Sequence, residues 1–264
     1  MKKRVIFPIA LTCFSLASTA CSFNTTQPAN EEESSTTTHW SYEGETGPEH
    51  WAELDPANTA CINGVEQSPI NIEKSKLIEK AELENLEINY IPSSFSLVNN
   101  GHTIQANPQA SDNSIVIDGK TYTLAQLHFH TPSEHQLNGK EFDMELHLVH
   151  KNEDDELAVL GVLIKEGNVN TTLEKMWNSI PEEKTEEEVK LAEPVDLMNI
   201  LPENQHTYQY EGSLTTPPCS EGVHWIVLEH PIEMSKKQIA AFRQIFPDNH
   251  RPVQPVKERE VIKN

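Results

Sequence analysis

Most of the chain after Leu86 consists of short segments in which apolar and polar residues alternate, and turn-forming residues separate these segments. Alternation with a period of two places successive side chains on opposite faces of a β-strand, so each segment predicts a strand with one buried face. The pair Asp118-Gly119 between two such segments is typical of a tight β-hairpin. The pattern therefore predicts a mainly β fold. The segments are SLVNNGHTIQAN, SIVIDGKTYTLAQLHFH, FDMELHLVH, LAVLGVLIK and HWIVLEHPI.

Few segments favour helices, and we expect these at the periphery of the sheet. One is Thr171–Ser179, and the other is Ser235–Ile245, which opens with a serine suited to cap a helix N-terminus. No internal repeat is visible, so we expect a single folded domain. Residues 181–193 are rich in Glu and predict a solvated loop.

The charge of the chain is strongly unbalanced, with 41 Asp and Glu against 20 Lys and Arg and a formal net charge of −21. A protein that binds nucleic acid regardless of sequence needs cations facing the phosphates, and binding to an anionic membrane surface needs basic patches. The sequence therefore argues against both classes. The 36% of hydrophobic residues still suffices for an ordinary core.

The N-terminus predicts a signal peptide over residues 1–20. Lys2, Lys3 and Arg4 form a positive region, and an apolar run follows as far as Ala20. This run is shorter than the roughly 20 residues that span a bilayer, so a cleaved signal fits better than a permanent membrane helix. Cleavage would change the net charge from −21 to −24, because it removes three positive charges and no negative ones.

Ser18-Thr19-Ala20-Cys21 resembles the lipobox of bacterial lipoproteins, in which the cysteine is acylated, although Ser18 stands where leucine is usual. Acylation of Cys21 would leave Cys61 and Cys219 as one even pair in an oxidising compartment. We therefore expect a lipid-anchored protein in the periplasm of a bacterial cell envelope. Simple cleavage after Ala20, which would give a soluble periplasmic or secreted protein, stays open as the alternative.

Residues 21–38 contain almost nothing to bury, since they are polar and acidic. Such a composition predicts a disordered tether, so the folded domain covers residues 39–264. We expect the acidic excess to lie partly in residues 31–33 of the tether and partly in the Glu-rich residues 182–193, away from the functional site.

Two of the predicted strands carry a histidine pattern that indicates a metal site. Gln126, His128 and His130 alternate along one segment and so share one face, as do Glu145 and His147 on another segment. If the two strands are neighbours, three imidazoles converge in the open three-ligand arrangement of catalytic zinc. The residues two positions before a ligand, Gln126 and Glu145, can then accept the other ring N–H of that ligand. A lone His-x-His pair is more often structural, but the combined pattern is much less easily accidental.

A cupin metal site is the competing interpretation of these residues. His128-x-His130-x3-Glu134 followed by His147 matches the cupin ligand set superficially. The glycines that a cupin motif places before and after its ligands are missing at the required offsets, so this interpretation is disfavoured.

Several sequence motifs, which follow one another in a fixed order, resemble those of a bacterial α-class carbonic anhydrase. The resemblance extends from His39 to about Pro255. The resemblance implies a single-domain fold with a central twisted, mostly antiparallel sheet of about ten strands, peripheral short helices, and zinc at the bottom of a conical cleft. It also implies zinc-dependent, reversible hydration of carbon dioxide to bicarbonate and a proton by zinc-bound hydroxide, inhibited by anions and sulfonamides. The blocks are HWSYEGETGPEHW, QSPINI, VNNGHTIQ, QLHFHTPSEH, MELHLVH, LAVLGV, GSLTTPPCSEGVHWIVL and RPVQP.

By this resemblance, His128, His130 and His147 bind Zn²⁺, and the fourth position holds water or hydroxide. Thr215 matches the threonine whose hydroxyl accepts the hydroxide proton and donates onward to a carboxylate, here Glu134. Taken alone, Thr-Thr-Pro-Pro would be read as an ordinary loop.

His102 in Asn-Asn-Gly-His matches the family's proton shuttle, although a solitary histidine after Asn-Gly is usually a turn residue. Tyr42, Asn100, Gln105 and Thr216 match the polar positions that order the intervening waters. Thr216 also matches a residue that lines the bicarbonate site.

An apolar wall for carbon dioxide is implied at four positions, although core packing is the simpler interpretation of the same residues from the sequence alone. These positions are Val149, Val159, Leu214 and Trp225.

Cys61 and Cys219 match the disulfide typical of bacterial members, and the alternative of two free buried thiols is unexpected after export. Because Cys219 directly follows the Thr215-Thr216-Pro217-Pro218 sequence, the bridge would also brace the active-site loop. The short connection Thr131-Pro132-Ser133 between a zinc ligand and the partner carboxylate fits the bacterial subtype, whose members often form dimers.

The alternative function is that of an acatalytic binding module, like the carbonic-anhydrase-related proteins that have lost zinc-ligand histidines. All three ligand positions are histidine here, and Thr215, Glu134 and His102 are also present, so we expect an enzyme. Of the remaining histidines, His135 and His150 are expected to be structural, and the others to lie at the surface.

Overall fold

The computed structural model describes residues 39–79, 86–110 and 112–263. The predicted signal peptide, the predicted acylation site Cys21 and the predicted tether lie outside these residues. Within the described part of the chain, no helix has the length and hydrophobicity needed to cross a membrane.

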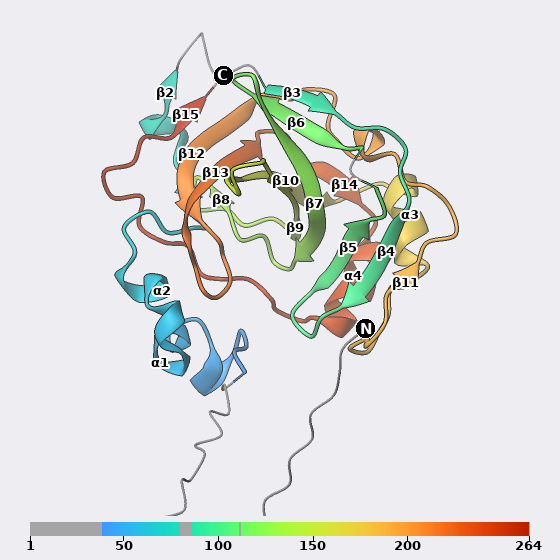
Figure 1. Ribbon diagram of the computed structural model, residues 1–264, viewed down its shortest axis with the longest axis horizontal. Helices are drawn as coiled ribbons and strands as arrows, with labels where there is room; N and C mark the ends of the chain where they lie inside the picture. Colours follow the sequence, from blue (N-terminus) through green and yellow to red (C-terminus); the bar gives the residue numbers. More distant parts are fainter. Residues whose placement is uncertain (1–38, 80–85, 111, 264) are drawn as a thin grey trace, which may run out of the picture. The chain divides into compact units, whose positions relative to one another are not determined.

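A large mixed sheet dominates the described chain (Figure 1), and ten of its strands follow one another in the order β11-β4-β5-β7-β9-β10-β13-β12-β15-β2. Three further strands join this path from the side, since β14 pairs with β10, and β6 pairs with both β7 and β3. The strands are β2 (Ile78–Glu79), β3 (Leu86–Asn89), β4 (Phe95–Asn99), β5 (Ile104–Pro108), β6 (Ser114–Ile117), β7 (Lys120–His130), β9 (Met144–Lys151), β10 (Leu157–Glu166), β11 (Val189–Lys190), β12 (Thr207–Ser213), β13 (Glu221–Leu228), β14 (Ile232–Met234) and β15 (Ile262–Lys263). A separate parallel pair consists of β1 (Asn71–Ile72) and β8 (Gln136–Leu137).

Most neighbours in the large sheet are antiparallel, and the parallel pairs are β10 with β13, β10 with β14, and β15 with β2. The mainly β architecture with peripheral helices is therefore confirmed. The main path has the ten strands that the resemblance implies, and the three strands beside it are three or four residues long. The expected hairpin is present between β6 and β7, where Asp118 and Gly119 both have positive φ.

The two faces of the central strands differ in character, as alternation requires. Leu127 and Phe129 of β7 belong to the larger hydrophobic core, which also contains side chains of α3 (Thr171–Trp177) and α4 (Lys236–Ile245). His128 and His130 of the same strand point to the opposite face. Helices α3 and α4 therefore cover one face of the sheet and leave the histidine face to the polar site.

Both predicted helices are present, and the serine that the sequence analysis identified caps the second one. The side chains of Ser235 and Gln238 form a capping box at the start of α4, and the Asn170 side chain caps α3. The remaining helices are short: α1 (Trp51–Leu54), α2 (Ala60–Asn63), and the 3₁₀ helices η1 (Gly44–Thr46), η2 (Pro56–Asn58), η3 (Lys74–Lys76) and η4 (Leu197–Asn199).

A disulfide joins Cys61 of α2 to Cys219 in the loop between β12 and β13, which confirms the expected pairing. The bridge packs with the buried Trp51 in a small hydrophobic cluster. It thereby attaches the N-terminal helices to the loop that carries Thr215 and Thr216.

One residue of the Glu-rich segment, Lys184, lies near the predicted shuttle His102, because the segment pairs with the sheet. The backbone N–H of Thr185 donates to the carbonyl of Asn99 at 3.0 Å, and Asn99 N–H donates back to Thr185 Oγ1 at 3.1 Å. Val189–Lys190 then pairs with β4 as β11. Lys184 consequently lines the same cavity of about 460 Å³ as His102. The Glu-rich composition predicts that the segment is exposed to solvent. It does not predict that the segment pairs with β4, because that pairing is made by backbone hydrogen bonds.

Candidate active site

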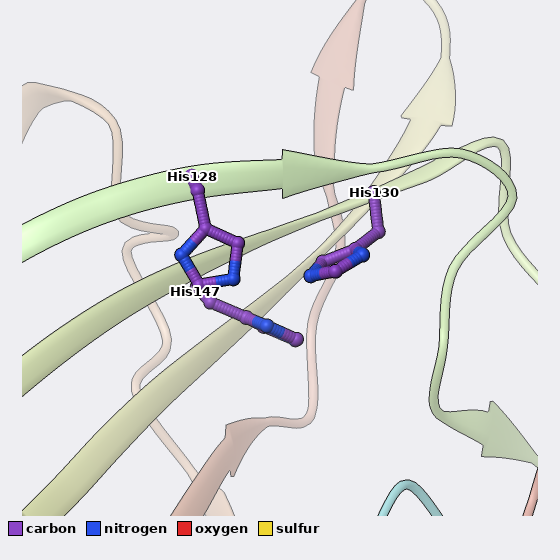
Figure 2. Close-up of side chains that lie close together, drawn as sticks. All are labelled: His128, His130 and His147. Carbon is purple, nitrogen blue, oxygen red and sulfur yellow. The ribbon is translucent and has the colours of Figure 1, made fainter. Parts of the chain in front are cut away.

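Strands β7 and β9 are neighbours, and their register brings the three predicted metal ligands together. His128 and His147 are direct partners across the two strands, and His130 is partnered with Glu145. One ring nitrogen from each of His128, His130 and His147 lies within 4.8 Å of the corresponding atoms of the other two. Figure 2 shows the three rings gathered on one side of the strands.

Hydrogen bonds determine which nitrogen of each imidazole stays available. His128 Nδ1 lies 2.8 Å from Gln126 Oε1, and His147 Nε2 lies 3.0 Å from Glu145 Oε1. Each acceptor oxygen has no proton to give, so the histidine nitrogen is the donor, and the other nitrogen of that ring keeps its lone pair.

His130 follows the same rule with a backbone acceptor. Its Nδ1 donates to the carbonyl of Asn249 at 2.7 Å. Its Nε2 is buried and has no hydrogen-bond partner among the described residues. A buried polar atom without a partner is costly, and a bound cation would satisfy it.

The electrostatic surroundings keep these rings in the form that binds metals. Burial, aided by His130 and His147, lowers the pKa of His128 well below its usual range. Burial also lowers the pKa of His130 to about 4 and depresses the pKa of His147. All three imidazoles are therefore neutral at pH 7, and three neutral imidazoles with an open fourth side form the donor set of catalytic Zn²⁺. The residues present fit a zinc ion.

Glu134 and Thr215 lie beside the three histidines. Glu134 is buried, its Oε2 lies 3.9 Å from His147 Nδ1, and its Oε1 accepts the backbone N–H of Arg251 at 2.8 Å. Burial raises the pKa of Glu134, while His147, the Arg251 N–H and the Thr215 hydroxyl oppose the rise. The structure therefore brings the predicted carboxylate and threonine into one group with the ligands.

Three of the predicted apolar residues lie side by side on the histidine face. Val149 of β9 pairs with Val159 of β10, which pairs with Trp225 of β13. Val159 and Trp225 are buried, while Val149 and Leu214 are partly exposed and pack against the same cluster. Val159 and Trp225 are therefore core residues, and Val149 and Leu214 are the partly exposed members of the set.

His102 lies farther out, stacked against an aromatic residue. Its ring centroid is 3.6 Å from that of Trp40 and 5.1 Å from that of His39. The Asn249 side chain donates to its backbone carbonyl at 3.0 Å. Burial, with smaller contributions from His39 and Lys184, lowers the pKa of His102 to about 4.

The other predicted polar positions differ in what they contact. Gln105 is the strand partner of His128, and its amide donates to Asn107 Oδ1 at 2.7 Å. Asn100 Oδ1 accepts the backbone N–H of His102 at 2.9 Å, so this side chain shapes the turn. Burial raises the pKa of Tyr42, and the Glu134 carboxyl raises it further. Thr216 lies next to Thr215 and is partly exposed.

Asn249 and Arg251 are the site residues that the sequence analysis did not identify. Asn249 holds His130 through its carbonyl, and its side chain accepts the backbone N–H of Thr131 at 2.7 Å. The buried Arg251 guanidinium donates to the carbonyls of Ser68 and Cys61. The Arg-Pro pair in the RPVQP block is the one sequence feature that could have pointed to Arg251. Its contacts lie more than 100 residues away in the sequence, so they cannot be inferred from residue spacing.

Comparison with known proteins agrees with this geometry. Residues 46–264 match the family model described as eukaryotic-type carbonic anhydrase. A carbonic anhydrase of Klebsiella pneumoniae is 46% identical over 226 residues, covering 85% of this chain and 90% of the relative. A carbonic anhydrase of Nostoc is 40% identical over 256 residues, covering 96% of this chain and 95% of the relative. The solved α-carbonic anhydrase of Thermovibrio ammonificans in complex with sulfanilamide is 45% identical, with a TM-score of 0.82, and the match covers 85% of this chain and 98% of that one. The chain therefore belongs to the eukaryotic-type, or α, carbonic anhydrase family.

Proposed function

We propose that this chain catalyses the reversible hydration of carbon dioxide to bicarbonate and a proton, with Zn²⁺ held by His128, His130 and His147. The observation that carries the proposal is the arrangement of the three rings, each of which bonds through one nitrogen and turns the other toward a common centre. Zinc so held supplies a water whose pKa is lowered to roughly 7, a value known for carbonic anhydrases as a class.

Glu134 and Thr215 orient the nucleophile in this proposal. One carboxylate oxygen of Glu134 accepts the Arg251 N–H, which leaves the other oxygen for the Thr215 hydroxyl. A threonine that donates its proton to Glu134 can act only as an acceptor toward the centre. The pair therefore selects one orientation of the attacking oxygen, and a fixed orientation lowers the entropic part of the barrier.

The apolar residues beside His147 would bind the substrate. Carbon dioxide has no net dipole and gains little from hydrogen bonds, so a wall of Val149, Val159, Leu214 and Trp225 can hold it without competing for the polar groups. Thr216, at the partly exposed end of the loop, would contact bicarbonate. Anions and sulfonamides would compete at the same place, which the sulfanilamide complex of the Thermovibrio ammonificans relative supports.

A proton must also leave the site, and His102 is the proposed carrier. A group is reprotonated by diffusion at no more than ~10¹⁰ M⁻¹s⁻¹. For a group with a pKa near 7, the rate of proton release to water is this rate constant multiplied by the acid dissociation constant, which gives only ~10³ s⁻¹. Faster turnover requires a relay, and histidine is the side chain that titrates closest to neutral pH. Tyr42, Asn100 and Gln105 would order the intervening waters.

For the location of the protein, we propose export to a bacterial periplasm with residues 1–20 as the signal and Cys21 as a lipid anchor. The sequence pattern and the Cys61–Cys219 disulfide support export. Labelling with a radioactive or clickable fatty acid, compared between the wild type and Cys21→Ser, tests the anchor.

The experiment that tests the enzymatic proposal is carbon dioxide hydration by the purified protein before and after removal of zinc with a chelator. Loss of activity on removal and recovery on addition of Zn²⁺ support it. An acatalytic binding module would show no hydration in either state.

A further inference from the structure

A buried chain of hydrogen bonds leads away from the metal ligand His147 and ends at the loop that carries Thr215. It begins at Glu145, which is completely buried and whose two oxygens accept four hydrogen bonds. Oε1 accepts His147 Nε2 at 3.0 Å and His135 Nδ1 at 2.7 Å. Oε2 accepts the backbone N–H groups of Glu134 at 2.9 Å and His135 at 2.8 Å. A carboxylate offers about four acceptor positions, so Glu145 is saturated as an anion.

This saturation determines the direction of every further bond in the chain. His135 donates from Nδ1, so its Nε2 is an acceptor, and the Tyr210 hydroxyl 2.6 Å away must be the donor. The Tyr210 oxygen then accepts the Ser68 hydroxyl at 2.9 Å. Ser68 Oγ accepts in turn the backbone N–H of Ser213 at 3.1 Å. Each donor points toward Glu145, and hydrogen bonds aligned in this way strengthen one another in a low-dielectric interior.

The far end of the chain is attached firmly to the loop before Thr215. Ser213 Oγ accepts the backbone N–H of Ser68 at 2.9 Å and donates to the carbonyl of Leu214 at 2.8 Å. The Ser213 carbonyl accepts the indole N–H of Trp225 at 2.9 Å. The residue that immediately precedes Leu214 and Thr215 is therefore held by the same network that orients His147.

Two glycines leave the space that this network occupies. A Cβ at position 212 would overlap the Ser68 hydroxyl and would lie 2.7 Å from Trp225 Cδ1. A Cβ at position 161, on the strand partner of His147, would lie 3.1 Å from Glu145 Oε1. Glycine inside a strand weakens it, so its presence at these two positions is explained by the close approach of the polar chain.

We propose that Tyr210 is a positioning residue for the zinc site: through His135 and Glu145 it fixes the ring of His147, and through Ser68 it fixes the loop that carries Thr215. This inference rests on the proposed function, because it concerns the zinc ion that His147 would hold. The role of Tyr210 requires only its hydroxyl, since the ring would pack equally well as phenylalanine.

The test compares Tyr210→Phe with Tyr208→Phe. Tyr208 lies two residues away on the same strand and is also buried, but its hydroxyl faces Glu229 at the sheet edge. Both variants lose one buried hydroxyl and keep the aromatic ring, but only the Tyr210 hydroxyl bonds His135 and Ser68. The readouts are the rate at which the zinc-loaded protein loses zinc to a chelator and the ¹⁵N chemical shifts of the imidazoles, which report the tautomers of His135 and His147.

Tyr210→Phe should release zinc about 3–10-fold faster than the wild type, somewhat less than the loss typical of residues that contact a ligand directly. The His135 and His147 nitrogen shifts should move in the same variant, and Tyr208→Phe should change neither quantity. Ser68→Ala, which keeps the tyrosine, should give a smaller acceleration. Equal release rates and unchanged histidine shifts in Tyr210→Phe and Tyr208→Phe would overturn the inference while leaving the proposed function intact. A wild-type protein that retains no zinc would overturn both.

Discussion

The imidazole of His102 lies flat against the indole of Trp40, with ring centroids 3.6 Å apart and planes 8° from parallel. This stacking removes water from the ring, and burial lowers the pKa of His102 to about 4. A proton that moves from a donor with a pKa near 7 to such a ring therefore goes energetically uphill. In the stacked position His102 is therefore a poor acceptor, and a proton relay requires the ring to reach a more solvated position.

The first prediction concerns this stack. Trp40→Leu should raise the pKa of His102 toward its ordinary value of 6.5, because the exposed ring regains its hydration. A proton NMR titration of the His102 resonances measures the change. His39→Asn serves as the control, since it removes a neighbouring charge and leaves the indole, and it should raise the pKa by less. A wild-type His102 that already titrates near 6.5 would contradict the account of the stack.

The second prediction concerns proton release. His102→Ala should slow carbon dioxide hydration in weak buffer, because protons then leave only through water. High concentrations of imidazole should restore most of the rate by acting as an external carrier. Stopped-flow hydration at low and high imidazole is the measurement. If the variant matches the wild type at low buffer, His102 does not carry the proton.

The third prediction concerns the Thr215 hydroxyl beside Glu134. Thr215→Val preserves the volume of the side chain and removes the hydroxyl, so kcat/KM should fall by about 100–1000-fold, the range found when one preorganised polar group is deleted. Zinc content should stay the same, because Thr215 holds no metal in the proposed scheme. A variant with full activity would show that orientation by this hydroxyl is unimportant.

The fourth prediction concerns acid stability. His150 is buried, and its Nε2 lies 2.8 Å from the Tyr90 hydroxyl. Burial lowers the pKa of His150 to about 4. The unfolded chain takes up a proton at this position below about pH 6.5, whereas the folded chain does so only near pH 4. His150 therefore contributes its full stability above pH 6.5 and loses it as the pH falls toward 4. Between pH 7.5 and 5 this loss is about 2 kcal/mol of the free energy of unfolding.

Urea denaturation of the wild type, His150→Gln and Tyr90→Phe at pH 7.5 and pH 5 measures this contribution. His150→Gln cannot take up the proton, so its free energy of unfolding should fall less between the two pH values. Tyr90→Phe keeps the imidazole and should retain the acid sensitivity of the wild type. Identical pH dependence in all three proteins would show that His150 does not titrate between the folded and unfolded states.

The parts of the site that could be predicted from the sequence are those governed by strand alternation. His128 and His130 share a face because a strand has a period of two, and the Glu145–His147 pair follows the same rule on the neighbouring strand. Their hydrogen-bonding partners Gln126 and Glu145 could be predicted for the same reason, since each lies two residues before a ligand.

Other contacts depend on the path of loops, for which the sequence has no periodic signal. The carbonyl of Asn249 meets His130 across 119 residues of sequence, and it does so through backbone atoms that composition cannot identify. The position of Lys184 near His102 is another example, because a Glu-rich composition predicts solvent exposure without specifying which part of the surface is covered. The direction of the bonds from Ser68 to Glu145 likewise emerges only when four separate segments are brought together.

Zinc content and carbon dioxide hydration, measured on the same purified protein, test the central claim most directly. The account predicts one zinc ion per chain, stopped-flow hydration far above the buffer rate, and loss of that activity on addition of a sulfonamide or on removal of the metal. A zinc-loaded protein that hydrates carbon dioxide no faster than buffer would contradict it.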